Sequence, residues 1–264
     1  MDLAILHDFG GVLAVAKPAG LATQAPAGIP SVESLVRERL FGEAVAAAHI
    51  AGRRRHPGGF LGVPHRLDRA VSGVLLLATT PRAARQLSRQ FERREIHKTY
   101  LAIVTPSATS SLTRGMTFEW RDTIRKVPDE PRAEIVPEGT ADSREAMTTG
   151  RVLPAADAEP LPAGVPRLPE GETLRSSAGM LVPDAGTLLL QLEPLTGRMH
   201  QLRVQAASRG LPVVGDAIYG GRPLGDARSE AIALHAWRIT FRDPATGTET
   251  TVTCPPPSSP PWPQ

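Results

Sequence analysis

The sequence of 264 residues has a single cysteine, three lysines and few aromatic residues. One cysteine, Cys254, excludes a disulfide framework and a cysteine-rich zinc site, and it suits a reducing compartment. Aromatic residues make up 4% of the chain, so it cannot build an extended platform that stacks many bases. No apolar run approaches the length of a membrane span, and residues 1–8 lack the features of a signal peptide. We therefore expect a cytoplasmic protein that does not contact a membrane.

Arginine supplies nearly all of the positive charge, and it is unevenly distributed. The formal net charge is only +3, yet residues 51–100 contain ten arginines and one lysine against one aspartate and two glutamates. A concentrated basic region indicates contacts with phosphate groups, although a GC-rich genome would also raise the arginine content. We expect the run Arg53–His56 to form a basic loop that contacts RNA, with a solvated charge cluster as the alternative.

The apolar pattern predicts short strands interleaved with helices. Strands are expected at 12–16, 74–79, 99–104, 188–192 and 233–241, and helices after Ser31, after Thr80 and at 199–208. In the second helix, Arg82, Arg85, Arg89 and Arg93 point outward, on a face that either lies against RNA or is solvated. The interleaving lacks regular βαβ spacing, which favours an α+β fold around one continuous mixed or antiparallel sheet flanked by helices and loops.

The rest of the chain is expected to be loop or tail. Residues 105–186 show no clear period, and we expect short strands there with a long acidic surface loop around 154–169 that does not contact RNA. We predict one catalytic domain over 1–250, with an acidic, proline-rich insertion at about 150–175. Residues 251–264 are proline-rich and are expected to form a disordered tail.

Residues 65–73 read His-Arg-Leu-Asp-Arg-Ala-Val-Ser-Gly and carry the strongest chemical signal. Asp68 lies between two arginines and just before the apolar run 74–78, so it is expected at the mouth of a core strand. Neighbouring cations favour the ionised form of a carboxylate, and an ionised carboxylate on a rigid scaffold is a candidate nucleophile. The alternative is a surface aspartate paired with an arginine for structural reasons.

This nonapeptide resembles the signature of the RluA-type RNA pseudouridine synthases, with Val71 in place of the usual threonine. Segments similar to other motifs of that family occur along the chain in the family's order, one before the nonapeptide at 17–21 and the others after it at 96–100, 195–203, 214–220 and 234–236. The resemblance implies the pseudouridine synthase catalytic fold, with an active-site cleft across the sheet. It also implies an RNA substrate, a stem-loop of rRNA or tRNA, and no cofactor, metal or obligatory protein partner. We expect a monomer without the small N-terminal RNA-binding domain of some relatives.

The resemblance also implies roles for individual residues. Asp68 is the nucleophile, Tyr100 lies against the uracil, and Arg203 pairs with Asp68 to fix its orientation. Arg66 enters the place of the extruded uridine, and Leu202 packs under the base. The other expected substrate-binding residues are His65, Arg69, Arg198 and His200. The spacing of the histidines does not fit a metal site.

Two other functions remain open at this stage. One is a non-catalytic RNA-binding protein of the same fold that acts as an RNA chaperone. The other is a hydrolase using Asp68 with His65, for which the sequence offers no second acid or base at readable spacing. Gln24 and Gln205 stand where the family often has histidine, and residues 105–186 match it weakly, so the choice of RNA is not predicted.

Overall fold

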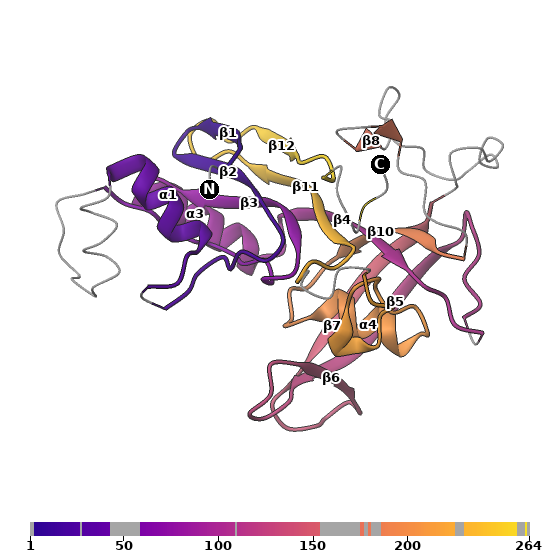
Figure 1. The fold of residues 1–264 in the computed structure, drawn as a ribbon. Coiled ribbons are helices and arrows are strands. Elements are labelled where there is room, and N and C mark those ends of the chain that lie inside the picture. Colours follow the sequence, from indigo (N-terminus) through magenta and orange to yellow (C-terminus); the bar gives the residue numbers. More distant parts are fainter. Residues whose placement is uncertain are drawn as a thin grey trace. The chain divides into compact units, whose positions relative to one another are not determined.

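The computed structural model describes residues 3–26, 28–42, 59–108, 110–153, 175–176, 179–180, 186–224, 230–257 and 262. The chain forms two compact units (Figure 1). Unit 1 combines Met1–His97 with Ala236–Cys254, and unit 2 combines Lys98–His235 with Pro255–Gln264. The stretch that we predicted as one domain, 1–250, is therefore built from two units, each of which is discontinuous in sequence.

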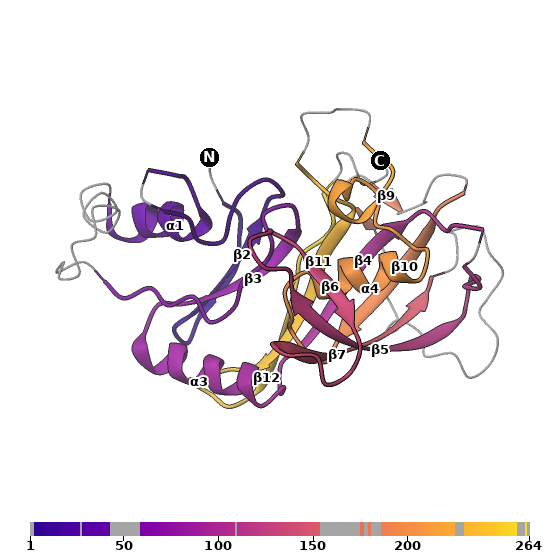
Figure 2. The ribbon, with the colours of Figure 1, turned by 90° about the horizontal axis from the view of Figure 1, so that it is seen from below.

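In its described residues, unit 1 combines antiparallel strands with the helices α1 and α3. Its elements are β1 (Ile5–Phe9), β2 (Val12–Lys17), α1 (Val32–Phe41), β3 (Ser72–Ala78), α3 (Pro81–Glu92), most of β11 (Leu234–Arg242), and β12 (Glu249–Thr253). The strands lie in the order β1-β2-β3-β11, and β12 pairs with β11. Figure 2 shows α1 and α3 on opposite sides of β2 and β3. This covering explains why every residue of β3 is buried and why the strand reads as a continuous apolar run.

Local signals in unit 1 define the helix starts as predicted. Ser31 caps α1, and its hydroxyl oxygen accepts the Ser34 amide at 3.2 Å. Thr80 caps α3 in the same way for the Ala83 amide, and a proline occupies the first helical turn. Gly73, in β3, has φ +121°, and a Cβ there would lie 2.2 Å from the Ala236 carbonyl oxygen. Only glycine fits at this point of the signature segment.

Unit 2 contains further antiparallel strands and, among its described residues, the helix α4. Its elements are β4 (His97–Val104), β5 (Thr117–Lys126), β6 (Ala133–Val136), β7 (Ser143–Val152), β8 (Arg175–Ser176), β9 (Gly179–Met180), β10 (Leu188–Pro194), α4 (Gln201–Ser208) and a 3₁₀ turn at Ala217–Tyr219. The strands lie in the order β4-β10-β7-β5-β6, while β8 and β9 pair with each other. Helix α4 packs on β5 and β6. A small apolar core joins them, formed by Ile124, Ala133, Ala146 and Val204.

The prediction of short strands in 105–186 is wrong for β5 and β7, which are ten residues long each and pair along nearly their whole length. Only Trp120 and Ile124 of β5 are buried, and its remaining residues are polar or charged except for Phe118, whose ring stacks on Trp120 at 4.5 Å between centroids. A strand with so few apolar residues gives a weak alternating pattern. The expected loop at 154–169, and the basic run Arg53–His56, lie outside the described residues.

The predicted start of a disordered tail at residue 251 is also wrong. Strand β12 continues to Thr253 and pairs with β11, and the Cys254 amide then donates to the Trp237 carbonyl at 2.8 Å. Trp262 is buried, with its ring edge against His235 at 5.6 Å between centroids. Backbone pairing with β11 compensates for the low apolar content of this segment. The α+β class itself is confirmed, and every strand pair whose register is described is antiparallel.

Candidate active site

Asp68 lies in unit 1, in the loop that leads into β3, as the sequence predicted. Its carbonyl oxygen accepts the Val71 amide at 3.1 Å, so a tight turn separates the carboxylate from the strand. The residue is half-buried. Val71 is 3% exposed, which explains why an apolar side chain is tolerated where the family has threonine. The turn therefore holds the carboxylate at the edge of a rigid core.

Lys17, at the end of β2, holds this loop by hydrogen bonds to main-chain carbonyl groups. Its side chain is 1% exposed, and its ammonium donates to the carbonyls of Pro18, Leu21 and Arg69 at 2.8, 2.6 and 3.2 Å. Three acceptors match the three donors of an ammonium group. Burial lowers the pKa of Lys17 to about 7, and the Asp68 carboxylate opposes part of this shift. Lys17 is thus a buried amine that supports the loop and interacts electrostatically with the Asp68 carboxylate.

Thr23 and Arg69 make further contacts that hold the same loop, the first to the Leu67 main chain and the second through the Arg69 side chain. The Thr23 hydroxyl accepts the Leu67 amide at 3.1 Å and donates to the Leu67 carbonyl at 2.9 Å. The Arg69 guanidinium donates to the Gly20 carbonyl at 2.9 Å while the rest of its side chain is exposed. Contacts to the main chain of Leu67 and Arg69 thus hold the loop on both sides of Asp68.

His65 has a supporting position in the loop. Its Nε2 accepts the Leu76 amide at 2.9 Å, and its ring stacks on Phe91 of α3 at 4.7 Å between centroids. A histidine that accepts at Nε2 carries its proton on Nδ1 when neutral. Arg66, next in sequence, is exposed. His65 therefore anchors the loop to α3, and Arg66 is the side chain of this segment that can reach a ligand.

Tyr100 lies in unit 2, on β4, where it pairs with Leu192 of β10. Lys98 is two residues earlier, so the two side chains share one face of the strand. Burial lowers the pKa of Lys98 to about 8, and its ammonium donates to the Thr196 carbonyl at 3.3 Å. A half-buried phenol thus lies beside a lysine whose charge changes near neutral pH, a feature that the sequence alone did not reveal.

Arg203 lies on α4 and is 4% exposed. Its Nε and Nη2 atoms donate to the two carboxylate oxygens of Asp216, at 2.7 and 2.8 Å, in a bidentate pair. Its guanidinium also lies over the ring of Tyr219, 5.2 Å from the centroid. Sequence reasoning missed this role of Asp216, although an aspartate next to the apolar residues Val213 and Val214 needs a cation. The predicted pairing of Arg203 with Asp68 would join the two units and stays a prediction.

The segment before α4 is strained and well anchored. His200 has φ 52° and ψ 22°, a conformation that is uncommon for a residue with a side chain. The Tyr219 hydroxyl accepts the Ala133 amide at 2.8 Å, donates to the Ala133 carbonyl at 3.2 Å, and lies 3.0 Å from His200 Nδ1. Because the hydroxyl proton goes to Ala133, the arrangement assigns the donor role to His200 Nδ1. Tyr219 thereby links β6 to the start of α4.

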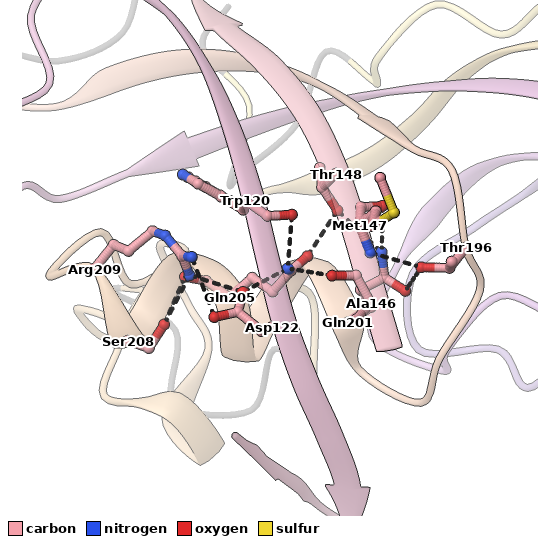
Figure 3. Close-up of polar contacts among 10 residues, drawn as sticks. All are labelled: Trp120, Asp122, Ala146, Met147, Thr148, Thr196, Gln201, Gln205, Ser208 and Arg209. Carbon is pink, nitrogen blue, oxygen red and sulfur yellow. Dashed lines mark hydrogen bonds and ion pairs between the residues drawn. The ribbon is translucent and has the colours of Figure 1, made fainter. Parts of the chain in front are cut away.

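Two buried glutamines attach α4 to the sheet (Figure 3). Gln205 accepts the Thr148 hydroxyl at 2.7 Å and donates to the Asp122 carboxylate at 2.7 Å. Gln201 accepts the Thr196 hydroxyl at 2.7 Å and the Arg198 amide at 3.0 Å. Gln205 stands where the resemblance leads us to expect histidine. It is fully buried, so its amide serves as a polar link inside the protein and not as a surface contact. The network fixes the helix that carries Arg203.

The remaining predicted residues lie around the same helix. Leu202 is buried, as expected for apolar packing. Arg198 is half-buried, and its Nε donates to the Glu145 carbonyl at 2.9 Å. Among the residues that the structure describes, no group of histidine, cysteine or carboxylate side chains could hold a metal ion. Within the same residues, no helix is long and apolar enough to cross a membrane.

Comparison with known proteins decides the family. Residues 11–208 match the sequence profile of the family described as RNA pseudouridylate synthase. The chain belongs to this family. The dual-specificity RNA pseudouridine synthase RluA of Escherichia coli K12 is 28% identical over 256 residues, which cover 96% of this chain and 93% of that protein. The tRNA pseudouridine synthase C of Yersinia pestis is 32% identical over 198 residues, covering 72% of this chain and 70% of that protein.

The fold agrees with this assignment to the pseudouridylate synthases. The structure of Human RNA Pseudouridylate Synthase Domain Containing 4 superposes with a TM-score of 0.61 at 21% identity, covering 95% of this chain and 87% of that chain. The resemblance predicted from the motifs is thus confirmed. In this pseudouridylate synthase, the structure collects the predicted residues in two groups. Unit 1 holds His65, Arg66, Asp68 and Arg69, and unit 2 holds Tyr100, Arg198, His200, Leu202 and Arg203.

Proposed function

We propose that this chain isomerises uridine to pseudouridine in structured ribosomal or transfer RNA, with Asp68 as the nucleophile. Two relatives carry these RNA classes in their names, the ribosomal large subunit pseudouridine synthase D of Xanthomonas campestris and the tRNA pseudouridine synthase C of Yersinia pestis. The observation that carries the proposal is the position of Asp68. Its loop is fixed through the main chain by Lys17 and Thr23, and it opens a core strand in a chain of the pseudouridylate synthase family.

The reaction breaks the bond from the ribose to N1 of uracil, rotates the base, and forms a bond from the ribose to C5. The proton on C5 is then lost and N1 gains one, so the atoms balance without an oxidant, a reductant or a group donor. One carboxylate suffices, because it can either form a covalent bond to the ribose or the uracil ring after their bond breaks, or stabilise a sugar cation. We propose no cofactor, and we propose that the protein acts as a monomer in the cytoplasm.

The other residues have roles that follow from their surroundings. Arg203, already held in one orientation by Asp216, presents a fixed cation that can orient the Asp68 carboxylate in the RNA complex. Tyr100 lies against the uracil and assists removal of the C5 proton. Arg66 is exposed, and its planar guanidinium can stack in the place of the extruded uridine.

The test is isomerisation by purified protein of RNA taken from cells that lack it. Wild-type protein is expected to form pseudouridine, and Asp68→Asn, which keeps the shape but removes the charge, should lower the single-turnover rate by at least about 10³-fold. Asp8→Asn, an exposed aspartate on β1, is the control and should leave the rate unchanged. Tight RNA binding by the wild type with no pseudouridine formed from rRNA or tRNA would favour the non-catalytic RNA-binding alternative.

A further inference from the structure

Among the described residues outside the candidate active site, a row of arginines lies on α3. Arg82, Arg85, Arg89 and Arg93, here called the arginine stripe, are all exposed. They follow one another at intervals of three, four and four residues, which places them on one face of a helix. From the first to the last, the helix rises about 16 Å. The stripe is therefore a continuous cationic ridge rather than scattered surface charge.

The N-terminal end of the stripe is unfavourable for its own helix, whereas Arg89, in the last turn, lies where the helix dipole favours a cation. The first turn of α3 contains no acidic residue, and Arg82 lies at the positive end of the helix dipole. Arg85 and Arg89, and again Arg89 and Arg93, are like charges four residues apart, an arrangement that destabilises a helix. Clustered charge that weakens its own element without a compensating contact is typical of a functional surface.

Little in the described part of the chain neutralises these arginines. Arg93 approaches Glu95 at 3.8 Å, with the two side chains 71% and 46% exposed. Arg82, Arg85 and Arg89 form no ion pair with any residue that the structure describes. An exposed pair at 3.8 Å contributes little attraction, so the stripe is left to bind an external polyanion.

The opposite face of α3 is rigidly attached to unit 1. Ala83 and Leu87 are buried, and the Gln90 side chain exchanges two hydrogen bonds of 2.8 Å with the main chain of Arg242. Phe91 stacks on His65, three residues before Asp68. A ligand on the stripe is thus held on the same rigid unit as the proposed nucleophile.

We propose that the arginine stripe binds the phosphate backbone of the double-stranded RNA stem that flanks the target uridine. This inference rests on the proposed function for the identity of the RNA. A double-stranded stem presents a regular row of phosphates, which suits a straight ridge of guanidinium groups. The stripe reads no bases, because phosphate contacts position a protein without carrying sequence information.

The test compares two triple variants with equal loss of charge. The stripe variant is Arg82→Ala/Arg85→Ala/Arg89→Ala. The control is Arg114→Ala/Lys126→Ala/Arg144→Ala, three exposed cations of unit 2. Dissociation constants are measured at several salt concentrations for a stem-loop RNA and for a single-stranded RNA of the same loop sequence. Circular dichroism checks that both variants fold.

The stripe variant should bind the stem-loop about 10- to 100-fold more weakly than wild type, with the slope of log K against log salt reduced by about 2 to 3. Its affinity for the single strand and its single-turnover rate at saturating stem-loop should stay within about twofold of wild type. An equal loss in the control, an unchanged salt slope, or an equal loss for both RNAs would overturn the proposal. Binding is measured apart from isomerisation, so a wild type that binds the stem but forms no pseudouridine would refute the proposed function alone.

Discussion

The two units hold their candidate catalytic side chains in different ways. In unit 1, Lys17 and Thr23 contact the main chain on either side of Asp68 and leave its carboxylate half-buried. In unit 2, the functional side chain itself is fixed, because Arg203 is buried in a bidentate pair with Asp216. We therefore expect that replacing the Asp68 side chain changes the stability of unit 1 little, because other residues hold its main chain. Replacing Asp216 should lower stability, because the ion pair itself holds Arg203.

The largest expected difference between the two units is in the stability of two aspartate variants. Asp216→Ala should lower the free energy of unfolding by about 3 to 5 kcal/mol, because it removes the carboxylate that forms a buried bidentate pair with Arg203. Asp68→Asn should change it by less than about 1 kcal/mol while abolishing turnover. Urea unfolding followed by circular dichroism measures both. Equal losses of stability in the two variants would show that the units do not differ in this respect.

The lowered pKa of Lys98, in unit 2, predicts how the free energy of unfolding changes with pH. The folded-state pKa of Lys98 is about 8, against 10.5 for the ordinary value. Below pH 8 both states bind the proton, and the native state bears the full cost of a buried ammonium, about 3 kcal/mol. Between about 8 and 10.5 the unfolded state binds more protons, so stability rises with pH.

Lys98→Met removes this dependence. The variant should therefore be more stable than wild type at pH 7, by up to about 3 kcal/mol, and the difference should shrink towards pH 10.5. Urea titrations at pH 7, 8, 9 and 10 measure it. The contribution of Lys17 is common to both proteins and cancels in the difference. A difference that is constant over this range would contradict the lowered pKa of Lys98.

The buried amide of Gln205 gives a smaller effect. Gln205→Leu should cost about 2 kcal/mol, since it leaves the Thr148 hydroxyl and the Asp122 carboxylate without this partner. Gln205→His should cost less, about 1 kcal/mol, because an imidazole can still accept one hydrogen bond and donate another. Thermal unfolding ranks the two variants. A histidine variant less stable than the leucine variant would contradict the assigned network.

The smallest expected effect is in unit 1, at the start of α3. Thr80→Ala removes the oxygen that accepts the Ala83 amide at 3.2 Å, and should cost about 1 kcal/mol. Thr80→Ser keeps that oxygen and is the control. A chemical denaturation series compares the three proteins. Activity should be retained in both variants, because the cap lies at the end of α3 far from Phe91, the residue that contacts His65 of the Asp68 loop.

The sequence predicted the parts of the structure whose signals are local. The loop of Asp68, the caps at Ser31 and Thr80, and the buried strand β3 each depend on neighbouring residues. A capping hydroxyl lies three residues from its amide, and an apolar run identifies its own strand. These patterns can be read without knowing what lies across the fold.

The parts that the sequence did not predict depend on distant partners. Asp216 binds an arginine thirteen residues earlier, at no spacing that a local rule recognises. Asp122 and Thr148 come from the segment with the weakest pattern, and their function becomes visible only when Gln205 of α4 lies beside them. Strand β12 is rich in threonine and is stabilised by pairing with β11. Each of these features is held by a partner distant in sequence, which a local sequence pattern does not reveal.

The most direct test of the account is a site-resolved map of pseudouridine across rRNA and tRNA in cells. Cells that lack this protein are compared with cells that carry the wild type or Asp68→Ala at equal levels. The account predicts that one or a few sites disappear without the protein, return with the wild type, and stay unmodified with Asp68→Ala. A site that Asp68→Ala restores in full would contradict the role of Asp68 as the nucleophile.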